Sequence, residues 1–123
     1  MVFDEGYGKD LDIFDMQCLK GVKRLEIRDD CFAKVNRLVI DGLNELKSVI
    51  VGKRSFYTKN DMRKGMICAI RNCDGLNEIH VGSSSFFYYE SFELKNLPSL
   101  KSIQLDDWAF YSCRRLVFDS MND

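Results

Sequence analysis

A phenylalanine recurs at a nearly constant interval along this chain, and the same pattern of apolar residues precedes it each time. The four positions are Phe32, Phe56, Phe86 and Phe110. Phe32 and Phe56 are 24 residues apart, Phe56 and Phe86 are 30 apart, and Phe86 and Phe110 are again 24 apart. Intervals of this length predict a repeat array, in which each unit buries its apolar face only against neighbouring units.

The apolar columns around each phenylalanine keep one register through the chain. Three columns precede it: Val22, Leu46, Leu76, Leu100; Leu25, Val49, Ile79, Ile103; and Ile27, Val51, Val81, Leu105. A second apolar pair follows it, at Leu38 and Ile40, Cys68 and Ile70, Phe92 and Leu94, and Leu116 and Phe118, with an orphan copy at Phe14 and Met16. The six additional residues of the longer interval fall between Phe56 and Cys68, because Cys68 and Phe92 are again 24 residues apart.

Each unit contains two alternating segments, and alternation at period two is typical of half-buried strands. A unit of this length with two strands leaves no room for a long helix. The predicted fold is therefore mostly β: a leucine-rich-repeat-like solenoid of about four 24-residue units with two short parallel strands per unit and little helix. We expect an irregular segment at 1–10, the array at 11–119 with an insert near 57–66, and a tail at 120–123.

The turn before each phenylalanine predicts an internal column of stacked rings along the array. The residue before the ring is small each time, at Cys31, Ser55, Ser85 and Ala109, and crowding beside the rings explains that. Gly52 and Gly82 follow the first strand of their units, where we expect a tight turn with positive φ.

Two phrases of the last unit resemble a known family. Leu97-Pro98-Ser99-Leu100-Lys101-Ser102-Ile103 and Trp108-Ala109-Phe110, with Cys113 following, are similar to the Leu-Pro-x-x-Leu-x-x-Ile and Ala-Phe-x-x-Cys signatures of BspA-like leucine-rich repeat proteins, which occur in anaerobic bacteria and protists. The resemblance covers roughly residues 11–119 and implies a divergent member of that family whose arrays act as recognition surfaces. Only one unit has the proline and only Cys113 matches the cysteine, so no family binding residue is carried over.

Composition indicates one compact domain: 123 residues, 46% hydrophobic, 30% charged, with a formal net charge of −1. A near-neutral chain lacks the basic excess of most nucleic-acid-binding proteins, so we expect no nucleic-acid partner. No apolar run has the length of a membrane span, and residues 1–10 lack the basic and apolar regions of a secretory signal. A reduced intracellular compartment is therefore favoured, although a longer protein would place the true start elsewhere.

Five cysteines raise the question of a metal or disulfide. Cys31, Cys68 and Cys73 occupy small or apolar columns, which predicts buried thiols that act as small hydrophobic residues. No Cys-x-x-Cys pair exists, and we expect neither metal nor cofactor. A disulfide between Cys68 and Cys73 stays open, but an odd count without a secretory signal favours reduced thiols. Cys18 and Cys113 fall in turns.

The sequence offers no coherent catalytic set, so we expect a non-enzymatic protein. The single histidine, His80, lies between two core columns, and alternation turns it outward. It is either an ordinary exposed strand residue or a pH-sensitive contact of a binding face. The acidic pairs Asp29-Asp30 and Asp106-Asp107 are interpreted as solvated turn residues.

A binding function would use the outward columns of the first strands. These columns are Arg24, Ser48, Glu78, Ser102 and Glu26, Ile50, His80, Gln104. Of these, Arg24, Glu26, Ile50, Glu78, His80 and Gln104 are the candidate partner-binding residues, with Arg24 the best candidate for a hot spot. The competing interpretation is a solvated sheet face without a partner. The outward column of the second strands, at Val39, Ala69, Glu93 and Val117, is a further candidate packing or partner surface.

The insert and its surroundings form the strongest local charge bias, with five cations against Asp61. Its members are Lys53, Arg54, Lys59, Arg63 and Lys64. Extra length in one repeat usually marks a loop on one face, often the binding face, whereas a charge run is more commonly a solvated loop. An aromatic column after the core ring, at Tyr57, Phe87 and Tyr111 with Tyr88 and Tyr89 adjoining, either forms an exposed stripe or folds back onto the core rim.

These observations predict a non-catalytic protein–protein interaction module that binds an unidentified protein through an exposed sheet face. The alternative is a structural segment of a larger repeat protein, with no ligand of its own and with ends that stack on further repeats. A segment with open ends is expected to self-associate through its strand edges, whereas a complete module is expected to be monodisperse.

Overall fold

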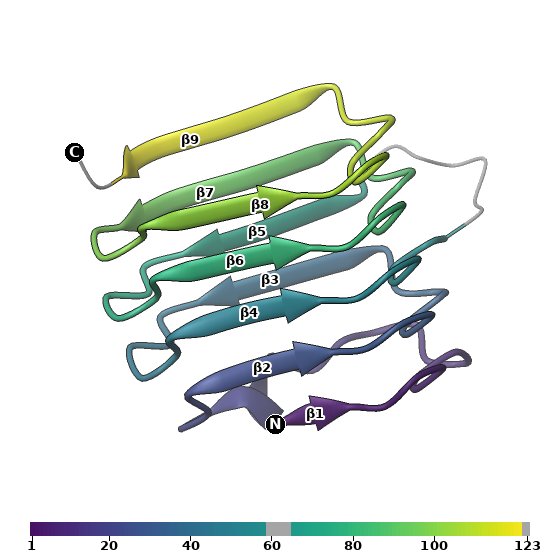
Figure 1. Ribbon diagram of the computed structural model, residues 1–123, viewed down its shortest axis with the longest axis horizontal. Coiled ribbons are helices and arrows are strands. Elements are labelled where there is room, and N and C mark those ends of the chain that lie inside the picture. Colours follow the sequence, from purple (N-terminus) through teal and green to yellow (C-terminus); the bar gives the residue numbers. More distant parts are fainter. Residues whose placement is uncertain (59–64, 122–123) are drawn as a thin grey trace.

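The computed structural model of the protein describes residues 1–58 and 65–121, and it is built mostly of strands (Figure 1). The first sheet has the strand order β1-β2-β4-β6-β8, and the second has the order β3-β5-β7-β9. The first sheet contains β1 (Val2–Phe3), β2 (Arg24–Ile27), β4 (Ser48–Val51), β6 (Glu78–Val81) and β8 (Ser102–Leu105). The second contains β3 (Arg37–Asp41), β5 (Ile67–Arg71), β7 (Ser91–Leu97) and β9 (Arg115–Met121). The mostly β class with little helix is thereby confirmed.

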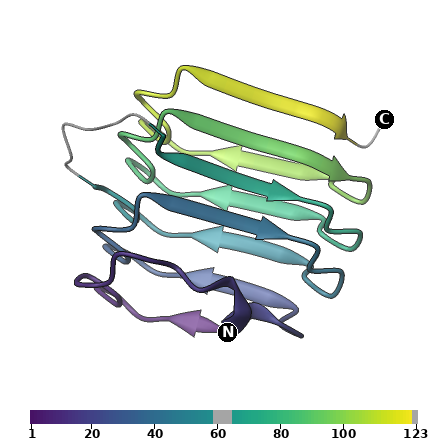
Figure 2. The same cartoon turned by 180° about the vertical axis from the view of Figure 1, so that it is seen from behind.

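Every pairing in both sheets is parallel, and the strands of the two sheets run in opposite directions (Figures 1 and 2). We call one first-sheet strand and the second-sheet strand that follows it a layer, so that β4 and β5 form one layer. Leu25, Val49, Ile79 and Ile103 pair in register across the first sheet. Leu38, Cys68, Phe92 and Leu116 do the same across the second. The pairing thus places the residues of each expected column side by side.

The core lies between the two sheets, because alternate residues of each strand point inward. Leu25, Ile79 and Leu38 are at most 1% exposed. Burial of an aliphatic side chain of this size contributes about 1.5–3 kcal/mol relative to leaving it in water. These apolar contacts across the two sheets hold the layers together.

The predicted column of rings is present at the turn that joins the two sheets. Phe56 and Phe86 stack with their centroids 4.5 Å apart and planes at 8°, and Phe86 and Phe110 stack at 4.8 Å and 2°. Phe32 continues the stack at 5.3 Å from Phe56. All four residues have positive φ of 54–55°, a conformation that is uncommon for bulky side chains. Each turn therefore places its ring in the core at the cost of an unusual backbone conformation.

The role expected of two glycines was wrong. Gly52 and Gly82 are absent from the positive-φ positions, and that conformation is adopted two residues later by Arg54 (54°) and Ser84 (63°). A Cβ at Gly82 would lie 2.6 Å from the backbone carbon and oxygen of Gly52. Glycine is needed at these positions because the backbones of neighbouring layers approach too closely for a side chain.

Strand β1 and residues 4–23 cover the β2 and β3 end of the core. The rings of Phe3, Tyr7 and Phe14 surround Phe32, with centroids 5.0–5.7 Å from it. A short 3-10 helix, η1 (Met16–Leu19), follows, and Asp15 caps it by accepting a hydrogen bond from the Gln17 amide. The sequence predicted irregular structure for residues 1–10, but this segment contains strand β1. Residues 2 and 3 form a strand because their backbone pairs with the edge of β2.

The core columns are exposed in the last layer, unlike in the inner layers. Ile103 and Leu105 of β8 are 38% and 40% exposed, and Leu116 and Phe118 of β9 are 61% and 49% exposed. Strand β9 also reaches Met121, beyond the expected boundary at 119. Within residues 1–58 and 65–121, no further strand pairs with the outer edges of β8 and β9, so their inward side chains have neighbours on one side only.

All five cysteines are free thiols. Cys31, Cys68 and Cys73 are buried, which confirms the prediction that they replace small apolar residues. Burial raises the pKa of the Cys68 thiol and keeps it protonated. Cys18 is exposed and Cys113 is half-buried.

Candidate functional site

The exposed face of the first sheet brings together the predicted binding residues of the first strands. Glu26, Ile50, His80 and Gln104 pair in register, and so do Arg24, Ser48, Glu78 and Ser102. Neighbouring strands lie about 4.8 Å apart, so each row is a regular line of side chains across the sheet. We call these eight residues the first-sheet face.

The members of the face differ in exposure. Arg24 and Gln104 are exposed, whereas Ile50 and His80 are half-buried. Ser48, predicted to point outward, is only 7% exposed, and its in-register neighbours on β2 and β6 are the longer residues Arg24 and Glu78. Ile50 is therefore an accessible apolar contact among polar neighbours.

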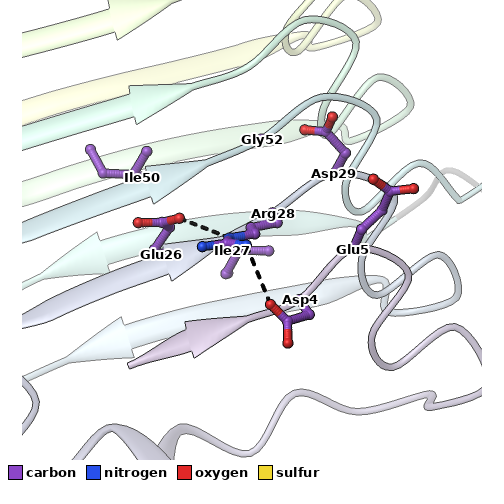
Figure 3. Close-up of a pocket in the computed structure, with 8 residues that line it drawn as sticks. All are labelled: Asp4, Glu5, Glu26, Ile27, Arg28, Asp29, Ile50 and Gly52. Carbon is purple, nitrogen blue, oxygen red and sulfur yellow. Dashed lines mark hydrogen bonds and ion pairs between the residues drawn. The ribbon is translucent and has the colours of Figure 1, made fainter.

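At the β2 end of the face, charged groups are linked in a chain of ion pairs. Arg28 Nε lies 3.1 Å from Glu26 Oε2, and Arg28 Nη1 lies 3.5 Å from Asp4 Oδ1 (Figure 3). Arg24 Nη2 lies 3.8 Å from Glu26 Oε1. Because these groups are largely exposed, each pair contributes about 0–1 kcal/mol to stability. These ion pairs link Asp4, Arg24, Glu26 and Arg28 but add little to the stability of the fold.

A shallow hollow adjoins these ion pairs. It is lined by Asp4, Glu5, Glu26, Ile27, Arg28, Asp29, Ile50 and Gly52 (Figure 3). Asp29 Oδ1 accepts a hydrogen bond of 2.8 Å from the Lys53 amide. The apolar side chain of Ile50 therefore borders a polar depression in which carboxylates outnumber cations.

At the opposite end of the face, His80 belongs to a hydrogen-bonded group of three residues. His80 Nε2 lies 3.0 Å from Asp106 Oδ2, and Gln104 Nε2 donates to Asp106 Oδ1 at 3.0 Å. The hydrogen bond from Gln104, followed by that from His80, lowers the pKa of the Asp106 carboxyl. The sequence interpretation treated Asp106 only as a turn residue. Asp106 comes two residues after Gln104, so alternation along the strand would have predicted that both side chains lie on the same face.

The basic insert is not brought onto the first-sheet face by the residues that are described. Arg54 Nε and Nη2 bind Asp30 Oδ1 and Oδ2 at 2.9 and 3.2 Å, and Asp30 belongs to the neighbouring turn. Lys53 is exposed beside it. Lys59, Arg63 and Lys64 lie outside the described residues. The charge of Arg54 is thus compensated within the chain.

A row of lysines borders the face and was missed by the sequence analysis. Lys23, Lys47 and Lys101 precede β2, β4 and β8, with Asn77 in the same column before β6. The Lys47 amide bonds the Lys23 carbonyl at 2.7 Å, and the same pattern continues through Asn77 to Lys101. All three lysines are exposed, and none forms an ion pair with any described residue. The sequence did contain a signal for this row, because lysine recurs one residue before three of the strands of the first sheet.

The aromatic column after the core ring divides into an outer and an inner part. Phe87 and Tyr111 stack at 4.9 Å, Tyr57 lies 5.4 Å from Phe87, and Tyr111 is 60% exposed. Tyr89 instead turns inward, is fully buried, and donates a hydrogen bond of 2.5 Å to the Val35 carbonyl. Tyr57 and Phe87 are half-buried, so the column forms a partly exposed stripe along the turns and, at Tyr89, also fills the core.

The second-sheet column is less accessible than expected. Ala69 is fully buried, and Val39, Glu93 and Val117 are half-buried. Arg71 lies 3.0 Å from both Asp41 and Glu93, which joins β3, β5 and β7 on this side. This network occupies the middle of the second-sheet face with paired charges.

Among residues 1–58 and 65–121, no three side chains of His, Cys, Asp or Glu are grouped so that they would hold a metal ion. None of the helices in those residues is both long and apolar enough to cross a membrane.

No known protein family, curated protein or solved structure matches this chain.

Proposed function

We propose that the chain is a leucine-rich-repeat-like solenoid that acts as a non-catalytic binding module for another protein, through the first-sheet face. The observation that supports this is the in-register row Glu26, Ile50, His80 and Gln104. The segments Leu97–Ile103 and Trp108–Cys113 are similar to BspA-like signatures, and this similarity supports the leucine-rich-repeat-like architecture.

The face has the chemical composition of a small interaction site. Protein interfaces combine a few apolar or Arg anchors with a polar surround that supplies hydrogen bonds. Ile50 would provide the apolar contact, and Arg24 the cationic one. Carbonyl, amide and imidazole groups around them come from Gln104 and His80.

Several side chains of the face already contact neighbouring side chains before a partner arrives. His80 and Gln104 are both held by Asp106, and Arg24 is within 4 Å of Glu26. Side chains that are already ordered lose less conformational entropy on binding, which costs about 0.5–1.5 kcal/mol for each mobile side chain. The exposed Lys23, Lys47 and Lys101 would favour a partner with an acidic margin, since opposite charges steer association.

A pair of matched substitutions tests this proposal. Ile50→Arg changes the centre of the first-sheet face, and Val39→Arg makes the same change at a half-buried β-branched residue of the second sheet. Both variants are used as bait in affinity capture, with circular dichroism to establish that they fold. We expect a partner of the native chain to be lost by Ile50→Arg and retained by Val39→Arg.

Photo-crosslinking makes the assignment direct. A photoreactive amino acid at position 50 should crosslink the partner, whereas one at position 39 should not. Equal capture by both variants, or crosslinking from position 39 alone, would contradict the proposed face. Recovery of no partner under any condition would favour the alternative of a structural segment without its own ligand.

A further inference from the structure

The end of the molecule formed by β8 and β9 exposes a cross-section of the apolar core. Ile103, Leu105, Leu116 and Phe118 are 38–61% exposed, whereas their in-register neighbours Ile79, Val81, Phe92 and Leu94 are at most 2% exposed. In each sheet, the outer edge of the last strand has no pairing strand within the described residues. Unpaired strand edges beside apolar side chains are templates for pairing with another chain.

The opposite end differs, because the chain itself covers it. Phe3, Tyr7 and Phe14 pack around Phe32, and Phe14 is only 9% exposed. Beside β3, the Asp41 amide bonds the sulfur of Met16 at 3.1 Å, so part of the β3 edge is occupied. Within residues 1–58 and 65–121, the β8 and β9 end is thus the one where core-column residues of both sheets are exposed beside an unpaired strand edge.

The sequence of β9 is complementary to itself when two copies run antiparallel. If the strands pair symmetrically about Val117, Leu116 of each copy lies opposite Phe118 of the other. In the same register, Arg115 lies opposite Asp119 on the outer side of the sheet. The apolar contact and the charge contact each occur twice, as a two-fold interface requires.

We propose that the protein forms a homodimer through this end, with β9 of one copy paired antiparallel to β9 of a second copy about Val117. The pairing joins the second sheets of the two copies and covers the open core at Leu105, Leu116 and Phe118. A two-fold contact uses the open end of both molecules, so association stops at two copies and forms no filament.

The mass of the chain in solution tests this directly. Light scattering coupled to size exclusion should give twice the 14.3 kDa of one chain, with dissociation on dilution. Leu116→Lys should weaken the dimer roughly 100-fold, because each buried lysine costs about tenfold or more and the symmetry introduces it twice. Ile13→Lys, at a 77% exposed apolar residue of the covered end, is the control and should leave the mass unchanged.

A charge exchange tests the register independently of folding. Arg115→Asp and Asp119→Arg should each weaken the dimer, because they place like charges opposite one another, and the double variant should restore it. Within one copy, Asp119 also has Lys95 as its in-register neighbour on β7. The double variant leaves Lys95 unchanged, so restoration of the dimer would show that the contact between Arg115 and Asp119 of different copies is the one that matters.

Three results would overturn the proposal. A mass of one chain at all concentrations would exclude the dimer, and a mass that grows steadily with concentration would indicate head-to-tail association. A dimer that survives Leu116→Lys, or is lost in Ile13→Lys, would lie elsewhere. Hydrogen exchange should in addition slow at the β9 amides as concentration rises, with no change at β4.

Discussion

The backbone amide of Ser55 donates a hydrogen bond to the hydroxyl of Ser85 in the next turn, over 3.0 Å. The Cys31 amide donates to Ser55 Oγ in the same way, at 3.2 Å. The two hydroxyls in turn donate to the carbonyls of Arg28 and Gly52, at 2.7 and 2.5 Å. Crowding beside the rings therefore explains only part of the small-residue column, because each serine also connects two turns through its hydroxyl.

Ser85→Ala is expected to destabilise the fold by about 1–3 kcal/mol, because it leaves the buried Ser55 amide without its acceptor. Urea denaturation followed by circular dichroism measures the loss. Ser83→Ala is the matched control, since this half-exposed hydroxyl has no hydrogen bond among the described residues. Equal stability of the two variants would show that the hydroxyl connection is not important.

Phe86→Ala is expected to cost about 3–5 kcal/mol, as for other fully buried aromatic residues. The ring is 1% exposed and lies between Phe56 and Phe110, so its removal opens a cavity in the stack. Chemical denaturation provides the measurement, and His80→Gln on the sheet surface should change stability by less than about 0.5 kcal/mol. A loss below about 1 kcal/mol for Phe86→Ala would mean that neighbouring rings refill the space.

The Asp106 carboxyl should titrate below the usual Asp pKa of about 3.9, because Gln104 and His80 donate hydrogen bonds to it. A lowered pKa in the folded state stabilises the fold above the unfolded pKa, and this contribution is lost as pH falls through the folded pKa. Carbon-detected NMR of the carboxyl provides the titration. Gln104→Ala and His80→Ala should each raise the pKa of Asp106, since each removes a hydrogen bond that lowers it. An unchanged titration in both variants would contradict this account.

The cysteines should react with maleimide in the order of their exposure. Cys18 is exposed and should be modified first, although burial and then Asp15 raise the pKa of its thiol. Cys68 is buried, and burial raises the pKa of its thiol as well, so it should react only after unfolding. Peptide mass spectrometry over time gives the order. Modification of Cys68 at the rate of Cys18 in folded protein would indicate frequent local opening.

Much of the sheet could be predicted because strands have a fixed period of two. Alternation placed Leu25 and Ile79 inward and turned His80 to the outer face, and the structure agrees on each. The spacing of the phenylalanines also predicted which residues become neighbours, because each layer adds one ring to the same stack. These properties depend on local backbone geometry that the sequence pattern expresses directly.

The features that escaped prediction depend on turns or on distant neighbours. Tyr89 turns inward while Tyr111 stays exposed, and residues in turns have no period from which to read this. Leu116 occupies a core column but is exposed, because burial there requires a further neighbour rather than a suitable side chain. The ion pair between Arg54 and Asp30 depends on the orientation of two adjacent turns.

The all-parallel pairing also constrains how the chain folds. Residues that face one another in neighbouring strands, such as Glu26 and Ile50, are separated by a whole passage through the other sheet (Figure 1). Forming the first such pair therefore requires closure of a long loop before any pairing energy is gained, which makes initiation slow. Each later strand closes a loop of similar length onto an edge that already exists. Folding is accordingly expected to start at one adjacent pair of layers and to advance one layer at a time.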